Sequence, residues 1–195
     1  MQKLKRFLEL KYSEVFDYLH KIKGFIFLIM GIFFIFFGLG FFIDLPLAIQ
    51  ESLLEYLKKL ILETEGFSLR EMILFLFSNN SLASFFGLVL GVIFGIFPLL
   101  SSVSNGFVVG FVSNLSVAEF GHFSLLALVP HGIFELPALF ISLGMGVKLG
   151  FSFFYKNGRR NFRELFNKSI WTYLLLVLPL LFIAAIIEGL LIILL

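Results

Sequence analysis

The stretch VPHGIFELPALFISLGMGVKLG, residues Val129–Gly150, organises the chain because it places ionisable groups inside a long apolar region. His131 and Glu135 are four residues apart, so on a helix they share one face and can touch. Pro130 and Pro137 bracket this pair, and each removes a backbone hydrogen-bond donor from a helix. An ionisable side chain at membrane depth is costly and usually faces a bundle interior, a partner or a water-filled cavity.

Two interpretations of this stretch are open. His131 and Glu135 form either a functional polar site where a membrane helix is broken, or a buried hydrogen bond that only holds helices together. The other polar groups expected within the apolar regions extend the candidate site. In full it comprises His131, Glu135, Glu188, Asn79, Asn80 and Asn105.

The composition is that of a polytopic membrane protein. The 195 residues are 59% hydrophobic and include 29 Phe, more apolar side chain than a soluble domain of this length can bury. Several segments exceed the roughly 18 to 20 apolar residues that cross a bilayer. The sequence therefore predicts an all-α transmembrane helical bundle, with one membrane domain over residues 24–195 behind an amino-terminal segment, residues 1–23.

Apolar runs predict about five spans, at residues 24–43, 72–97, 99–114, 123–155 and 170–194. Pro98 is expected to end or kink the second of these. The fourth region is longer than one straight crossing needs. Because it contains Pro130 and Pro137, we expect a broken helix there, or a short re-entrant piece followed by a full span.

Two amphipathic segments flank the first span. Residues 1–23 carry six basic side chains among apolar residues at helical spacing, which is typical of a helix lying on an anionic cytoplasmic leaflet. An ordinary solvated helix that leads into the membrane fits the same pattern equally well. Residues 45–65 combine one apolar stripe with many charges, so we expect them to lie flat at the opposite interface or to cap the bundle.

Basic residues predict the orientation. Residues 1–23 and the loop after Tyr155 are basic, whereas the segment after the first span is acidic. The positive-inside rule then gives a multi-pass protein of the cytoplasmic membrane, with its amino terminus in the cytoplasm and its carboxyl terminus outside. In this orientation the outward half of the membrane contains Asn79, Asn80, His131, Glu135 and Glu188.

Glycines at intervals of four predict close packing of helices. Small residues at this spacing let two helix backbones approach each other in lipid, where packing rather than the hydrophobic effect drives association. The glycines expected at such contacts are Gly87, Gly91, Gly95, Gly106, Gly110, Gly132, Gly146 and Gly150. This pattern argues for packing and not for chemistry.

The run PHGIFELPA, Pro130–Ala138, resembles the signature of the stage II sporulation protein M family of prokaryotic membrane proteins. The resemblance covers most of residues 72–195. Further elements that carry it are Asn79–Asn80 ahead of a glycine-rich span, the run from Gly95 to Pro98, Asn105–Gly106, and Glu188 in the last span.

The resemblance implies an integral membrane protein of about five spans with no established enzymatic activity. It also implies that His131, Gly132 and Glu135 are the polar element that the family shares. The namesake of the family works with peptidoglycan-degrading partners during engulfment in spore formers. The partners expected for this chain are therefore the lipid bilayer, other membrane or envelope proteins, and a second copy of itself.

Three functions are compatible with these features. A scaffold or subunit of a membrane complex is favoured, since glycine-rich spans and amphipathic segments offer packing surfaces. The alternative is a small transporter or channel in which His131, Glu135 and Glu188 handle protons or an ion, because histidine changes charge near neutral pH and titrates together with a nearby carboxylate. The third is an intramembrane metal-dependent hydrolase, with His131, Glu135 and either Glu188 or His122 as ligands.

Enzymatic function has little support in the sequence. The chain has no cysteine and only three histidines, and it contains neither an HExxH motif nor a GxSxG elbow. No P-loop, dinucleotide fingerprint or nucleic-acid-binding pattern is present. The first apolar run is too long for a cleaved signal peptide and is interpreted as a retained anchor. We expect no cofactor, no metal and no nucleic-acid partner.

Overall fold

The structure, a computed structural model, describes residues 2–154 and 158–194, without the side chains of residues 2–4, 7–8, 127–131, 158–161 and 194. All elements in these ranges are helical. In chain order they are α1 (Gln2–Phe42), α2 (Leu47–Thr64), α3 (Leu69–Val89), η1 (Leu90–Val92), α4 (Ile96–Phe120), η2 (His122–Ser124), α5 (Leu125–Phe151), η3 (Ser152–Phe154), α6 (Gly158–Thr172), η4 (Tyr173–Val177) and α7 (Leu178–Leu194).

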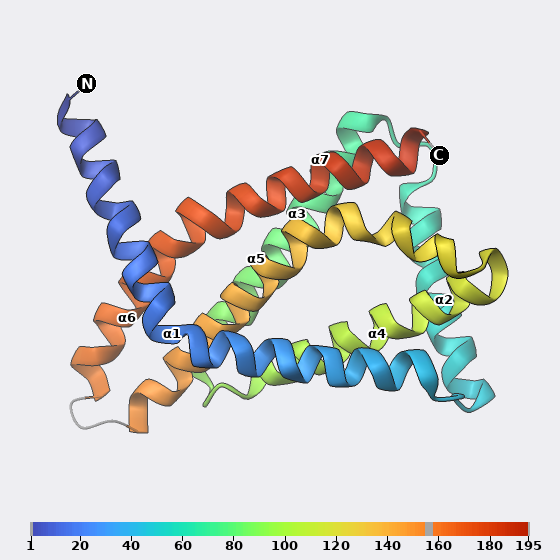
Figure 1. Ribbon diagram of the computed structural model, residues 1–195, viewed down its shortest axis with the longest axis horizontal. Coiled ribbons are helices and arrows are strands. Elements are labelled where there is room, and N and C mark those ends of the chain that lie inside the picture. The colour runs from blue at the N-terminus through green and yellow to red at the C-terminus, as the bar shows by residue number, and fades with distance from the viewer. Residues whose placement is uncertain (1, 155–157, 195) are drawn as a thin grey trace.

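The predicted all-α bundle with five spans is confirmed. The described segments that are long and apolar enough to cross a membrane are Glu9–Phe42, Leu69–Val92, Ile96–Phe120, Gly132–Phe154 and Phe162–Ile193. The second half of α1 and α4 run close to the long axis of the molecule, whereas α3 and α5 lie oblique to it (Figure 1). The amino-terminal part of α1 and α6 lie at one end of this axis, whereas α2 runs crosswise at the other end, where α7 finishes (Figure 1).

The central helix is α5, which contacts α1, α3, α4 and α7. Its carboxyl-terminal half is almost continuously buried from Ala138 to Gly150, with half-buried side chains only at a few positions such as Lys148. A helix that is apolar on every side and surrounded by others is the expected core of a bundle. The second part of the stretch Val129–Gly150 is therefore the centre of the fold.

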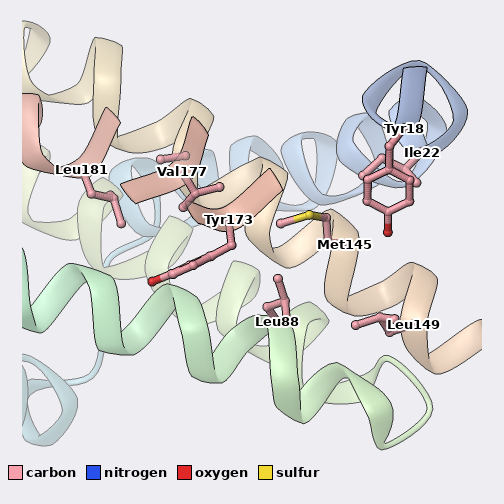
Figure 2. Close-up of a cluster of buried hydrophobic side chains, with 9 residues drawn as sticks. Tyr18, Ile22, Leu88, Met145, Leu149, Tyr173, Val177 and Leu181 are labelled. Carbon is pink, nitrogen blue, oxygen red and sulfur yellow. The ribbon is translucent and has the colours of Figure 1, made fainter. Parts of the chain in front are cut away.

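One buried cluster joins four spans (Figure 2). Tyr18 and Ile22 enter it from α1, and Leu88 enters it from α3. Further members come from α5, η4 and α7, and they include Met145, Leu149, Tyr173, Val177 and Leu181. α1 continues as one helix across the expected boundary at residues 23 and 24. Because Tyr18 and Ile22 are buried in this core, the turns of α1 before that boundary are anchored in the bundle.

The boundary between the second and third spans differs from the prediction. The second span does not reach Pro98, because the chain turns at Phe94 and Gly95, which have positive φ angles of 52° and 71°. Pro98 is the third residue of α4. Since the first N–H groups of a helix have no acceptor within it, proline is tolerated there. The third span is consequently longer than expected, Ile96–Phe120 instead of residues 99–114.

The expected break in the fourth region is also corrected. A single helix, α5, runs from Leu125 to Phe151 through both Pro130 and Pro137. It bends instead of breaking (Figure 1). A proline in a membrane helix removes one hydrogen bond, and packing against neighbouring helices preserves the rest of the ladder. The length beyond one crossing is taken up by the bend and by η3, which follows α5.

Candidate functional site: a polar pocket at the α2 end of the bundle

Four of the predicted site residues line one pocket. Asn79 and Asn80 of α3, Glu135 of α5 and Glu188 of α7 surround a cavity of about 320 Å³. Apolar side chains complete the wall, and they are Leu60, Ile61, Met72, Phe75, Leu76 and Ile192, together with Thr64. The pocket therefore lies where α2 crosses the end of the bundle.

Local interactions fix the helices that carry these residues. α3 begins with a capping box, in which the Glu71 N–H donates to Ser68 Oγ at 3.4 Å and the Ser68 N–H donates to the Glu71 carboxylate at 2.9 Å. α7 lies directly against α3, because a Cβ added at Gly189 would be 2.8 Å from Ile73 Cγ1. This close contact places the neighbouring Glu188 at the pocket.

Glu188 carries a buried oxygen without a hydrogen bond. Its Oε2 atom has no hydrogen-bond partner among the residues that the structure describes. Glu188 is half-buried, and it lines the pocket together with Glu135, which is also half-buried. A buried carboxylate oxygen without a donor is costly in a low-dielectric site, so this atom is available to accept a hydrogen bond from an incoming donor.

Of the predicted pair His131 and Glu135, the structure describes the side chain of Glu135 only. His131 lies on α5, one turn before Glu135, but its side chain is outside the described residues. The contact between the two side chains therefore stays a prediction.

Asn105 does not line the pocket. It is exposed on α4, and its Nδ2 donates to the Ser101 carbonyl oxygen of the preceding turn at 2.8 Å. A carboxamide that bonds its own helix in this way needs no partner on another helix. The sequence placed Asn105 in the candidate site because it could not distinguish this local bond from a contact between helices.

Glycines hold α5 against the end of α3 and the turn that follows. A Cβ at Gly91 would fall on the backbone of Gly146, and a Cβ at Gly146 would lie 2.6 Å from the Gly87 carbonyl oxygen. A Cβ at Gly150 would overlap Gly91 and Gly95. A larger residue at Gly91, Gly146 or Gly150 would force the two backbones apart.

A second glycine contact joins α1 and α4. Cβ atoms at Gly106 and Gly110 would overlap the carbonyl groups of Phe33 and Phe37. Gly40, which the sequence analysis did not single out, packs in the same way on Phe107. Gly132 differs from the other predicted packing glycines, since the only atom of the described residues within 4 Å of its Cβ position is Leu136 Cδ1 of its own helix, at 3.9 Å.

The sequence model of the family described as Stage II sporulation protein M (SpoIIM) matches residues 25–191, from the first span into the last and across every residue of the pocket except Ile192. The chain belongs to the stage II sporulation protein M family. The predicted resemblance is confirmed. It was expected over most of residues 72–195, and the match also includes the first span from residue 25 and α2. No curated protein and no solved structure is significantly similar to the chain.

This SpoIIM family member also contains hydroxyl contacts that sequence analysis missed. Tyr173 Oη donates to the Ser81 carbonyl oxygen at 2.6 Å and lies 3.3 Å from Ser84 Oγ. In Figure 2 the Tyr173 ring extends from the last span toward α3. Ser142 Oγ of α5 donates to the Ser84 carbonyl oxygen at 2.7 Å. These hydroxyls join three helices beneath the pocket.

The pocket offers oxygen acceptors and carboxamides, but its described part is not a metal centre. Among the residues that the structure describes, no three His, Asp or Glu side chains come together in a way that could hold a metal ion. Carboxylates and carboxamides can accept hydrogen bonds from a cationic or polar group, and carboxylates can exchange protons. The arrangement therefore suits the binding of a hydrogen-bond donor or the handling of protons.

Proposed function

We propose that this chain is a membrane-embedded subunit of a SpoIIM-type complex and that it binds a partner at the polar pocket. The observation that carries the proposal is the meeting of Glu135, Glu188 and the Asn79–Asn80 pair, with Glu188 Oε2 lacking a donor among the described residues. A donor from a partner segment would satisfy this oxygen and remove its desolvation cost.

Close packing beneath the pocket supports binding over passage. Leu88, Met145 and Val177 are fully buried. The backbones of Gly91 and Gly146 meet between α5 and the end of α3. Protein interiors packed at this density transmit neither water nor ions without rearrangement. A recess that is open at one end and filled below serves recognition better than conduction.

The charge distribution supports an extracytoplasmic position for the pocket. Arg163 and Lys168 belong to α6, at the end of the bundle opposite α2 (Figure 1). α2 itself has two basic residues, Lys58 and Lys59, against the three carboxylates Glu51, Glu55 and Glu63. Under the positive-inside rule the α6 end is cytoplasmic, so the pocket opens to the outside, where an envelope protein can reach it.

Co-purification tests this function. The tagged full-length chain is extracted from its native membrane in mild detergent, and the captured proteins are identified by mass spectrometry. We expect a membrane or envelope protein to be retained by the wild type and lost in Glu188→Gln, which removes the negative charge but preserves the shape of the side chain. Charge-assisted hydrogen bonds are roughly twice as strong as neutral ones.

Glu119→Gln is the matched control. Glu119 is an exposed carboxylate near the end of α4 and does not line the pocket. Its substitution should leave the captured set of proteins unchanged. Recovery of the wild-type chain alone, or equal losses in both variants, would contradict binding at the pocket.

Proton or ion handling is the second candidate, because Glu135 and Glu188 come from different spans and meet in one pocket. Carboxyl groups inside membrane spans mark many proton relays. The purified chain, reconstituted into vesicles with an entrapped pH-sensitive dye, would then dissipate an imposed pH gradient faster than protein-free vesicles, and Glu188→Gln would abolish the difference. Equal rates with and without the protein would leave partner binding as the function of the pocket.

A further inference from the structure

An apolar groove lies between α1 and α5, apart from the polar pocket. Its volume is about 550 Å³, and residues of α1 from Leu19 to Phe34 face residues of α5 from Gly132 to Ile141 across it. All side chains that line it are apolar except Lys23. Both walls belong to segments that are apolar enough to cross a membrane, so the groove opens toward lipid.

The groove lies where α1 and α5 diverge from their close contact, at which a Cβ added at Gly144 would be 3.1 Å from the Ile26 backbone nitrogen (Figure 1). Their closest aromatic contact is between Phe33 and Phe140, whose ring centroids are 5.2 Å apart. Among the residues that the structure describes, no atom of another helix lies within 4 Å of the Cβ position of Gly132, although glycine usually marks a close helix contact in membranes. Phe27 and Ile133 remain about 60% exposed on the two walls. The space next to Gly132 is wide enough for an additional hydrocarbon chain.

Lys23 supplies a charge at one end of this apolar surface. It is exposed, lies just before the predicted start of the first span, and has no ion-pair partner among the described residues. His20 and Lys21 precede it in the same turn of α1, next to Tyr18, whose Oη lies 2.8 Å from Ser169 Oγ of α6. An unpaired cation at the interface, followed by an apolar groove at membrane depth, matches the two parts of an anionic lipid.

We propose that the groove binds an anionic phospholipid, with one acyl chain between α1 and α5 and its phosphate at Lys23. The apolar walls satisfy the chain by dispersion contacts, and the ammonium group neutralises the headgroup. The site is independent of the polar pocket and of the partner proposed for it. It assigns a function to Gly132, whose small size preserves the space for the chain.

Quenching by brominated lipid measures this binding. The chain has one tryptophan, Trp171, so Trp171→Phe combined with Phe27→Trp places a single reporter in the groove. The full-length protein is reconstituted into phosphatidylcholine vesicles that contain equal fractions of brominated phosphatidylglycerol or brominated phosphatidylcholine. We expect stronger quenching by the brominated phosphatidylglycerol.

Two matched pairs of variants test the headgroup and the chain separately. In the reporter background, Lys23→Gln should lower the preference for phosphatidylglycerol about fivefold, the effect of one basic residue near a charged membrane surface. Lys21→Gln, which removes an exposed charge outside the groove, should change it little. Gly132→Leu should reduce quenching by both lipids, whereas Gly31→Leu should not, because the Cβ position of Gly31 is open and lies outside the groove.

Several results would overturn the proposal. Equal quenching by the two lipids in the reporter protein without further substitution would contradict recognition of the anionic headgroup, and equal effects of Lys23→Gln and Lys21→Gln would indicate a diffuse surface charge. Unchanged quenching in Gly132→Leu would contradict the binding of an acyl chain in the groove. Size-exclusion elution and thermal melting verify that each variant is folded, and Gly132→Ala provides a smaller change if the leucine variant does not fold.

Discussion

The two halves of α5 both contain glycine but have opposite environments. From Ala138 to Gly150 the helix is enclosed, and Gly146 and Gly150 touch the backbone at the end of α3. Before Ala138 the same helix carries Glu135 into a polar pocket, and no described atom of another helix lies within 4 Å of the Cβ position of Gly132. A glycine in a membrane helix therefore has two uses, close contact in one half and open space in the other, and only its neighbours distinguish them.

Chemical labelling gives the largest expected effect, because it is all or none. The chain has no cysteine, so single cysteines can be introduced without background. Glu63→Cys, exposed on α2, should react with a membrane-impermeant maleimide in intact cells, whereas Asn167→Cys, exposed on α6, should react only after the membrane is opened. The reverse pattern would place the open half of α5 in the inner leaflet.

Gly91→Leu should have the largest effect on stability. Its side chain would have to displace the backbone of Gly146, so overpacking should lower the free energy of unfolding in detergent by about 3 kcal/mol. Gly132→Leu is the control from the open half and should change the melting temperature little. If Gly91→Leu melted like the wild type, the contact between α3 and α5 would not be as close as the structure places it.

Substitutions at Glu135 separate structure from chemistry in the open half. Glu135→Leu strands the polar groups around the pocket and should cost about 2 kcal/mol of stability, whereas Glu135→Gln retains most hydrogen bonding and should melt normally. If Glu135→Gln melts normally but loses the partner or the proton flux, the carboxylate acts chemically. Equal stability of the leucine and glutamine variants would show that the pocket does not depend on this residue.

The number of spans could be predicted from the sequence because span length follows from bilayer thickness. Gly91 and Gly146 could be predicted as contacts because spacing by four marks one face of a helix. Their partners could not, and for that reason Gly132 was grouped with them and Gly40 was missed. The spacing defines a face, but only the arrangement of the helices decides whether another backbone or lipid lies against it.

Proline and carboxamide residues limited the prediction of the site in the same way. Pro98 and Pro137 were expected to interrupt helices, yet Pro98 occupies a first-turn position and Pro137 lies within a helix that its neighbours support. Asn79, Asn80, Glu135 and Glu188 were predicted at one depth and line one pocket, because polar groups in hydrocarbon gather where they can satisfy each other. Local bonding removed Asn105 from this set.

Tyr173→Phe should give the smallest effect and tests the closed half. The Tyr173 hydroxyl donates to the Ser81 carbonyl oxygen at 2.6 Å, and the ring packs edge-on against Phe85, which the substitution preserves. Only the hydroxyl is lost, and hydrogen bonds between membrane helices average about 0.6 kcal/mol in double-mutant cycles. Tyr56→Phe, exposed on α2, is the matched control and should have no measurable effect.

A loss well above 1 kcal/mol in Tyr173→Phe, measured by unfolding in detergent, would mean that the hydroxyls of Tyr173, Ser84 and Ser142 act as one cooperative network. The closed half would then depend on polar contacts as much as on glycine packing, and the contrast between the two halves of α5 would be weaker than the structure indicates.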